Sequence, residues 1–417
     1  MGPNERTVEQ STSVPSPHWL DRERIQVYSI AMLIVYAVVI VIWAWMTKGF
    51  TSDHMVRPGS DFSVFWSTSY VALKAGAIKA YDFAALQPVI AAQGSLPANS
   101  HFFLPWLYPP TFLLFVIPLS LLPYAVSYVV FIGLTGAAYV VSLVRLVGLR
   151  SGAGRAVWLA VIAFPAIYFA ATIGQNSMLT AALAAFAIPR LKTQPVLAGV
   201  LIALLTIKPQ LAALFPLALL AARAWKPLAV AGVAAALLLL AGIAVFGWET
   251  VPAFFANTKF AKQSMLDNGS VMWYAMPTVL SALLLAGASF ATAAVAHGAV
   301  AVLAALGLFL VWRRDTSTGL RAASLAVATL MASPYLWFYE VTWVGIAIAG
   351  LTADGLRRGW LRWERELLVV AWLLPLYLGL NRVTFFPQIG PLVLALLMLA
   401  ILRRVHVITR GNPDWLP

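Results

Sequence analysis

The feature that most constrains this chain is the length of its apolar segments. Residues 102–404 are almost entirely apolar and are interrupted only by short basic loops. Apolar runs of about 20 residues with few charges are typical of transmembrane helices, whereas a transmembrane barrel requires strands of alternating polarity. The sequence shows long runs rather than alternation. It therefore predicts an all-α, polytopic membrane protein.

The composition supports the same fold class. Of the 417 residues, 61% are hydrophobic and 10% are charged, against roughly 25% charged residues in an average soluble domain. We expect about 12 transmembrane helices. Segments such as residues 197–207 and 211–222 are too short for a full span, and irregular backbone at membrane depth is tolerated where it lines a cavity. These short segments therefore predict a water-accessible cavity.

The distribution of basic residues predicts the topology. The N-terminal tail and six short loops hold 20 of the 28 Lys and Arg residues, and the net charge is +13. We interpret this excess as the positive charge of cytoplasmic loops rather than as a nucleic-acid-binding surface. The six loops are residues 145–155, 190–192, 223–226, 313–321, 357–365 and 403–410.

This topology divides the chain into three parts. Residues 1–26 are polar and lack the apolar core of a signal peptide, so we expect a cytoplasmic tail. Residues 27–404 form a single transmembrane domain that begins with an uncleaved first helix at residues 27–45. Residues 46–101 are its first outer loop, whose amphipathic stretches predict interfacial helices. Residues 405–417 form a second cytoplasmic tail.

The residues that commonly bind metals are scarce. The chain has no cysteine, and its five histidines show no spacing typical of a metal site. We therefore predict no cofactor and assign no metal ligand, although the sequence leaves a divalent metal open.

Two charged residues at predicted outer turns are candidates for chemistry. Asp61 begins an amphipathic stretch in the first outer loop, where it could act as a general base or cap a helix. Lys208 lies between two apolar runs. A lysine at membrane depth is costly, so it either binds an anion such as a phosphate or extends to the interface.

Four further residues occupy the same predicted side. Glu340 either lines a polar cavity or belongs to a structural ion pair. Gln175 and Asn176 either bind hydroxyl groups or form a hairpin turn. Arg382 either binds a phosphate or rests among lipid headgroups. A carboxylate and cations around one outer cavity suit transfer from a lipid-linked phosphate donor.

The order of several motifs resembles glycosyltransferase family 87 of the GT-C superfamily. The resemblance covers roughly residues 30–400 and is carried by short motifs in a fixed order. These are Ser60-Asp61-Phe62, Gly76, Tyr81-Asp82, Tyr108-Pro109-Pro110, Pro118-Leu119, Leu122-Pro123, Gly174-Gln175-Asn176, Lys208-Pro209-Gln210 and Ser333-Pro334.

The resemblance implies a GT-C-like architecture and an inverting glycosyltransferase. The implied donor is a polyprenyl-phosphate sugar, with mannose as the expected hexose, and the acceptor is a lipid or glycan at the outer face of a bacterial plasma membrane. By analogy with the family, Asp61 is the catalytic base and Lys208 lies near the donor phosphate. The other predicted residues that bind the donor's phosphate or sugar are Tyr108, Gln175, Asn176, Glu340 and Arg382.

The chain departs from one feature of the family. Mycobacterial members commonly carry a histidine near the motif that follows Ser-Pro, and this chain has Tyr339-Glu340 there. That difference puts the mycobacterial acceptor in doubt. The alternative function from another class is a transporter or flippase of lipid-linked substrates. Such a protein should show repeat symmetry, and the sequence contains no convincing internal repeat.

Overall fold

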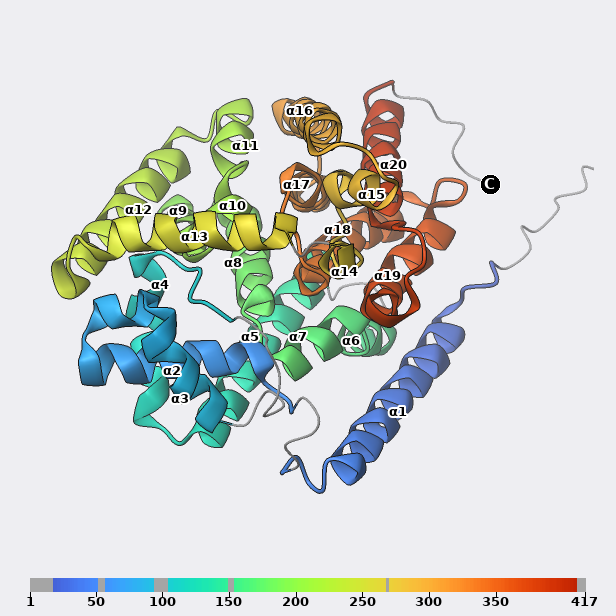
Figure 1. The fold of residues 1–417 in the computed structure, drawn as a ribbon. Coiled ribbons are helices and arrows are strands. Elements are labelled where there is room, and N and C mark those ends of the chain that lie inside the picture. Colours follow the sequence, from blue (N-terminus) through green and yellow to red (C-terminus); the bar gives the residue numbers. More distant parts are fainter. Residues whose placement is uncertain (1–17, 52–56, 94–103, 149–153, 268–269, 411–417) are drawn as a thin grey trace, which may run out of the picture.

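The computed structural model describes residues 18–51, 57–93, 104–148, 154–267 and 270–410. The fold is all-helical, with 81% helix and no strands among these residues (Figure 1). This confirms the predicted all-α class.

Seven helical segments of the described chain are long and apolar enough to cross a membrane. The predicted number of about 12 spans and the GT-C architecture are not confirmed by this count. The predicted first helix at residues 27–45 is present within α1. The seven segments are α1 (Arg22–Met46), α5 (Tyr124–Val147), α6 with α7 (Gly154–Ile162 and Pro165–Ile173), α12 (Trp225–Phe246), α16 (Phe290–Arg313), α19 (Glu364–Thr384) and α20 (Gly390–Arg410).

Other helices are shorter than a full span and pack among or across the long ones. They are α2 (Ser60–Ala75), η1 (Ala77–Tyr81), α3 (Phe83–Ala92), α4 (Pro110–Val116), η2 (Ile117–Leu121), α8 (Ser177–Arg190), α9 (Pro195–Ala203), η3 (Leu204–Ile207), α10 (Pro209–Ala212), α11 (Phe215–Ala221), α13 (Thr250–Asp267), α14 (Ser270–Trp273), α15 (Val279–Leu285), α17 (Thr318–Ala332), η4 (Phe338–Val341) and α18 (Thr342–Arg358).

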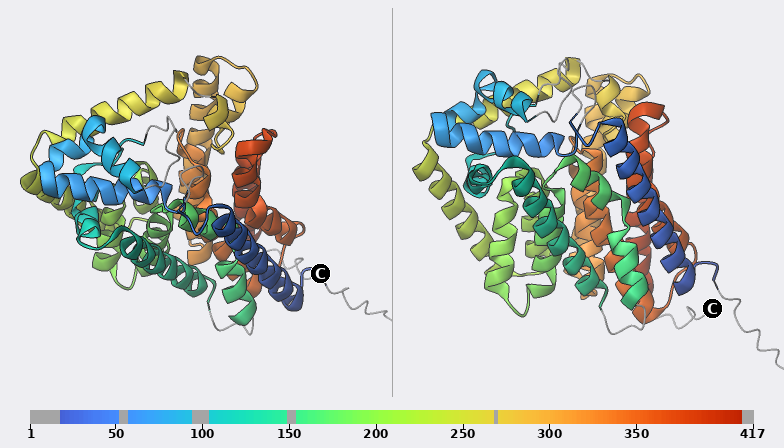
Figure 2. Two further views of the ribbon diagram at one scale, coloured as in Figure 1. Left: turned by 60° about the horizontal axis from the view of Figure 1, so that its bottom comes forward. Right: turned by 90° about the horizontal axis from the view of Figure 1, so that it is seen from below.

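Two helices lie across one end of the bundle. Figure 2 shows α2 and α13 lying across the long helices α5 and α12 at one end of the molecule. The helix α2 belongs to the predicted first outer loop, and its buried face carries Phe62, Phe65 and Val71. This apolar face packs against α4 and the residues before it, including Trp106, Tyr108 and Phe112, so the predicted interfacial position of the loop stays a prediction.

The centre of the molecule is built from short helices with small side chains. Gly319 of α17 and Gly350 of α18 approach so closely that a Cβ atom on either glycine would lie 2.6 Å or less from a backbone oxygen of the other. Four alanines of α17 are also buried: Ala322, Ala323, Ala326 and Ala328. Small residues allow helix backbones to approach and gain dispersion energy where lipid supplies no hydrophobic drive.

A buried arginine ties three helices together at the other end. Arg404 of α20 is fully buried, and it donates to Asp354 of α18 over 2.8 Å and to Glu364 of α19. A buried charge is tolerated when it is paired and hydrogen-bonded. This cluster fixes the helix ends near the basic loops.

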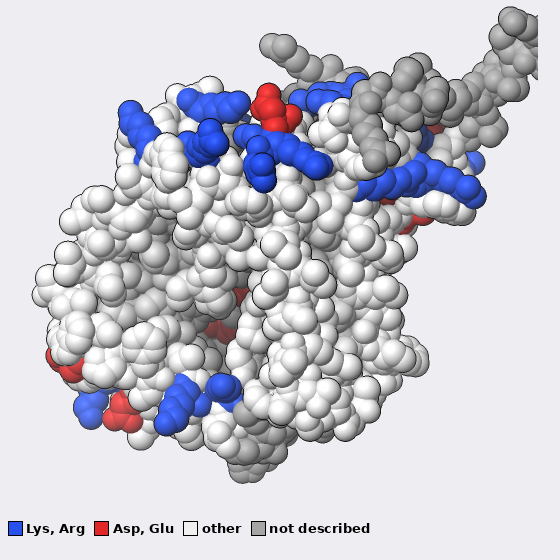
Figure 3. Space-filling view, turned by 90° about the horizontal axis from the view of Figure 1, so that it is seen from above, with Lys and Arg blue, Asp and Glu red and all other residues white. Residues whose placement is uncertain are grey.

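Charged side chains gather at the two ends of the molecule. Figure 3 shows a dense row of Lys and Arg along one edge, a wide uncharged band, and a smaller group of charges at the opposite edge. The uncharged band matches the apolar surface expected of a chain that spans a bilayer.

Candidate active site

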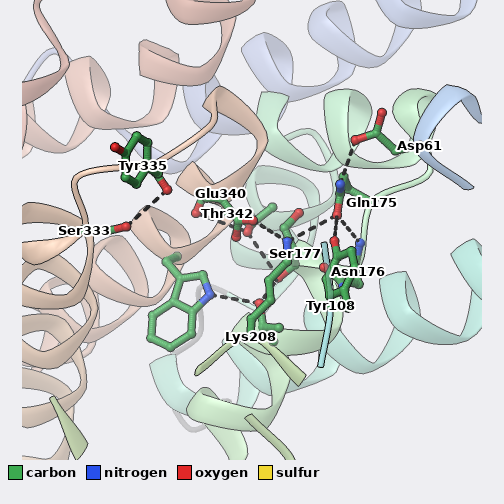
Figure 4. A network of polar contacts seen from close by, with 12 residues as sticks. Asp61, Tyr108, Gln175, Asn176, Ser177, Lys208, Ser333, Tyr335, Glu340 and Thr342 are labelled. Atoms are coloured by element: carbon green, nitrogen blue, oxygen red, sulfur yellow. Dashed lines mark hydrogen bonds and ion pairs between the residues drawn. The ribbon is translucent and has the colours of Figure 1, made fainter. Parts of the chain in front are cut away.

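The first helix turn of α2 carries Asp61 and is held against α7. Gly59 is the N-cap of α2 and has a left-handed φ of 87°. Its backbone N–H donates to Thr172 over 2.8 Å, and its carbonyl accepts from the Tyr124 hydroxyl over 2.9 Å. Asp61 therefore follows the cap rather than serving as the cap. Asp61 is partly buried, and its carboxylate faces the turn between α7 and α8 (Figure 4).

That turn brings Gln175 to Asp61. Gly174 ends α7 with a left-handed φ of 82°, and a Cβ atom on it would lie 2.5 Å from the Cβ atom of Phe62. Glycine is required here by both the backbone angle and the close approach of α2. The Gln175 side-chain amide then donates to Oδ2 of Asp61 over 2.7 Å.

Lys208 reaches the same turn from a break between two short helices. The break lies between η3 and α10, where Pro209 begins the new helix and removes a backbone donor. The Lys208 side chain is buried, and its ammonium group donates to Oε1 of Gln175 over 3.3 Å and to the Glu340 carboxylate. The rings of Tyr108 and Tyr339 each lie 5.6 Å from this nitrogen, within cation–π range.

Tyr108 and Asn176 complete the polar network. The Tyr108 hydroxyl donates to Oε1 of Gln175 over 3.3 Å, and the Asn176 backbone N–H donates to the same oxygen over 3.0 Å. Both residues are buried. Figure 4 shows Asp61, Gln175, Tyr108, Lys208 and Glu340 in one continuous set of contacts.

Arg382 lies beside this network. It is in the last turn of α19, and its guanidinium lies 4.9 Å from the centre of the Phe338 ring in η4. Its charge acts on Asp61. The structure thus gathers six of the predicted site residues into one bonded cluster and places the seventh, Arg382, at its edge.

Several site residues carried no signal in the sequence analysis. Ser177 and Thr342 join α8 to α18 through a 3.3 Å hydrogen bond, and Trp343 donates to Thr180 over 3.1 Å. These contacts join α8, which follows Gln175, to α18, which follows Glu340. Hydroxyl and indole groups within apolar helices are common, so nothing in the pattern marked them.

Two motifs of the resemblance have local structural roles. Asp82 caps α3 by accepting from the backbone N–H of Ala84. The Ser333 hydroxyl donates to the backbone carbonyl of Tyr335 over 3.2 Å.

Some buried polar atoms of the site have no partner among the described residues. They are both side-chain amide atoms of Asn176, the Ser177 hydroxyl and Oε2 of Glu340. Buried polar groups are nearly always hydrogen-bonded in native proteins. These atoms can therefore bind hydroxyl groups or water at the site.

Burial determines the acidity of Asp61, which lies outside the seven candidate spans. Desolvation raises the pKa of its carboxyl above the ordinary aspartate range. The hydrogen bond from Gln175, the charges of Lys208 and Arg382, and the hydroxyl of Ser60 lower it, and burial outweighs them. A carboxylate with a raised pKa is a stronger base than a surface aspartate.

The site contains no grouping of acids and histidines suited to a metal. Within the described residues, no three His, Cys, Asp or Glu side chains lie close enough together to hold an ion. The arrangement offers the carboxylate of Asp61, a second carboxylate paired with Lys208, the nearby cation Arg382 and neutral hydrogen-bonding groups.

The two ends of α8 and α19 show at which end of the bundle the site lies. The helix α8 begins beside Gln175 and Asn176 and ends with Arg190, and α19 begins near Arg362 and Arg365 and ends with Arg382. A helix of 14 residues, such as α8, spans about 21 Å. The site therefore lies at the end of the bundle away from the basic loops.

Comparison with known proteins identifies one family. The model of glycosyltransferase family 87 matches residues 106–334, which is more than half of the 417 residues. The match includes Tyr108, Gln175, Asn176 and Lys208, whereas Asp61, Glu340 and Arg382 lie outside it. No curated protein and no solved structure matches the chain.

Proposed function

Because the chain belongs to glycosyltransferase family 87, we propose that it transfers a hexose from a polyprenyl-phosphate sugar to a lipid or glycan acceptor, with mannose the expected sugar. The family and the seven apolar segments make it a membrane glycosyltransferase. The donor, the acceptor and the mechanism are our proposals.

The observation that carries the proposal is the placement of Asp61 and Lys208 on opposite sides of Gln175. A base for the acceptor hydroxyl and a cation for a phosphate thus lie within one polar cluster, separated by one amide. Group transfer from a phosphate requires both charges close to the reacting centre.

In the proposed reaction, Asp61 removes the proton of an acceptor hydroxyl as its oxygen attacks the anomeric carbon. The bond between that carbon and the phosphate oxygen breaks, and the polyprenyl phosphate leaves with the electron pair. The configuration inverts, so a β-linked donor yields an α-linked product. A phosphate leaving group needs no proton from an acid, but it needs positive charge nearby.

Lys208 and Arg382 are the proposed sources of that charge. Arg382 provides a planar donor that can bind two phosphate oxygens, and Lys208 provides a buried point charge. The unpartnered groups of Asn176, Ser177 and Glu340 are proposed to bind sugar hydroxyls. Tyr108 is proposed to line the same pocket.

The proposed membrane is a bacterial plasma membrane, and two observations support an outward-facing site with a lipid-linked donor. The site lies at the end away from the basic loops, which the positive-inside rule assigns to the cytoplasm. Figure 3 shows a hollow in the uncharged band with acidic side chains inside it, on the face formed by α11, α12 and α16 in Figure 1. A lipid-linked substrate could enter such a hollow from the bilayer.

The test is sugar transfer by purified protein in liposomes. The donors are radiolabelled polyprenyl-phosphate mannose, glucose and arabinose, and a crude lipid extract supplies acceptors. We expect a labelled product from the mannose donor and an α linkage in that product. Movement of the intact donor between leaflets without a new product would instead support the alternative transporter or flippase.

A further inference from the structure

The side-chain oxygen of Gln175 accepts three hydrogen bonds. The donors are the Asn176 backbone N–H at 3.0 Å, the Lys208 ammonium group at 3.3 Å and the Tyr108 hydroxyl at 3.3 Å. A backbone N–H and an ammonium group can only donate. The atom that faces them must therefore be the amide oxygen, and this fixes the orientation of the amide.

The fixed orientation directs the amide N–H group at Asp61. Its nitrogen lies 2.7 Å from Oδ2 of Asp61, which must accept. Figure 4 shows the other carboxylate oxygen of Asp61 directed away from Gln175. One oxygen is thus occupied by a neutral donor, and the other is turned toward the space outside the network.

Gln175 also keeps two opposite charges apart. It bonds to Asp61 through its nitrogen and to Lys208 through its oxygen, and the Lys208 charge is compensated by Glu340 instead. A direct ion pair between Asp61 and Lys208 would stabilise the carboxylate and make it a weaker base. It would also occupy the cation that a phosphate requires.

We propose that Gln175 is a positioning residue that orients the Asp61 carboxylate and separates it from Lys208. The role of Gln175 in catalysis rests on the proposed function. Its effect on the orientation and pKa of the Asp61 carboxyl is independent of that function. The sequence analysis assigned Gln175 to substrate binding, whereas the geometry assigns it to the base. The charged or titratable groups that face this arrangement are Lys208, Arg382, Glu340, Tyr108 and Tyr339.

The direct experiment is an infrared titration of the purified protein, which needs no substrate. The band of the protonated Asp61 carboxyl is assigned by its loss in Asp61→Asn. In Gln175→Glu, a carboxylate replaces the neutral donor, so the titration midpoint of Asp61 should rise by about one pH unit or more. Gln175→Met removes both the donor to Asp61 and the acceptor of Lys208 without adding a charge, so the midpoint should shift by a smaller amount.

The matched control is Gln194→Glu, the same substitution at an exposed glutamine at the N-cap of α9. It should leave the midpoint unchanged. An unchanged midpoint in both Gln175 variants would overturn the proposal. If Gln175→Glu does not fold, Gln175→Met, which adds no charge, still tests the loss of the amide.

The second readout is the pH profile of kcat/KM for transfer from the polyprenyl-phosphate sugar that the wild type uses. The acidic limb should move to higher pH in Gln175→Glu, by the same amount as the infrared midpoint. A rate that falls equally at every pH would show a structural role only and would contradict the proposal. Absence of transfer by the wild type would count against the proposed function, while the infrared result would still decide the role of Gln175.

Discussion

The ammonium group of Lys208 and the carboxylate of Glu340 form a buried ion pair across 132 residues of sequence. Their side chains are 6% and 7% exposed, so neither charge is well solvated by water. Such a pair is favourable only when its remaining groups are also bonded. Here Gln175 accepts from Lys208, whereas Oε2 of Glu340 has no partner among the described residues. The pair explains how this chain keeps a lysine charged at a depth where its short flanking helices are apolar.

Removing one member of this pair should destabilise the protein strongly. Either Glu340→Gln or Lys208→Met leaves one buried charge without its partner, which costs about 3–5 kcal/mol. The double variant Lys208→Met with Glu340→Gln should cost clearly less than the sum of the two single variants, because no charge remains. Thermal unfolding in detergent measures all three. Costs that simply add would show that the two side chains do not interact.

Gly174→Ala should be more disruptive than an alanine at another glycine with positive φ. Its Cβ atom would overlap Phe62, so α2 would have to move away from the turn and carry Asp61 with it. Gly148 has a φ of 89° and open space around its Cβ position, so Gly148→Ala should cost only about 1–2 kcal/mol of backbone strain. Unfolding temperatures compare the two variants, and equal shifts would reject the steric argument.

As the solution is made more acidic, the activity should decline at a higher pH than it would with an aspartate base of ordinary pKa. Burial raises the pKa of Asp61, and a base works only when it is ionised. As the pH falls through this raised value, Asp61 takes up a proton and kcat/KM should decline. Its pH profile gives the free-enzyme pKa directly. A constant rate down to the ordinary aspartate range would contradict the raised value.

Arg382→Gln should weaken use of the donor more than it weakens folding. The guanidinium lies over Phe338 beside the network, where a phosphate could reach it. We expect the KM for the donor to rise by about tenfold or more, since charge-assisted contacts contribute about 1.5–3 kcal/mol. Lys262→Gln, on the exposed helix α13, is the control and should leave KM unchanged. Equal KM values for both variants would remove Arg382 from the donor site.

The helical fold could be predicted from the sequence because lipid imposes simple requirements. Segments such as α1 and α12 are recognisable in the sequence as long apolar runs. A backbone that spans the bilayer must satisfy its own hydrogen bonds, so each such run is expected to form a helix. Short central helices such as α8 and α17 are harder to count, because burial against protein needs no fixed length. This is why the predicted number of spans exceeds the seven long segments.

The members of the polar cluster could be picked out from the sequence, but their pairing could not. A polar residue at an apolar turn stands out, and this identified Asp61, Gln175, Lys208 and Glu340. Sequence offered two readings for Glu340, a cavity or an ion pair, and the structure pairs it with Lys208. The role of Gln175 depends on three hydrogen-bond donors that reach its side-chain oxygen, two of them from distant segments of the chain. No sequence pattern predicts such contacts.

The most direct test of the whole account compares sugar transfer in liposomes by wild type and by Asp61→Asn. Asparagine keeps the size of the side chain and removes the base, and Asp82→Asn is the matched control at the cap of α3. We predict that Asp61→Asn lowers kcat by about 10²–10⁴-fold while Asp82→Asn retains the wild-type rate. Wild-type transfer by a folded Asp61→Asn protein would contradict the assignment of Asp61 as the base.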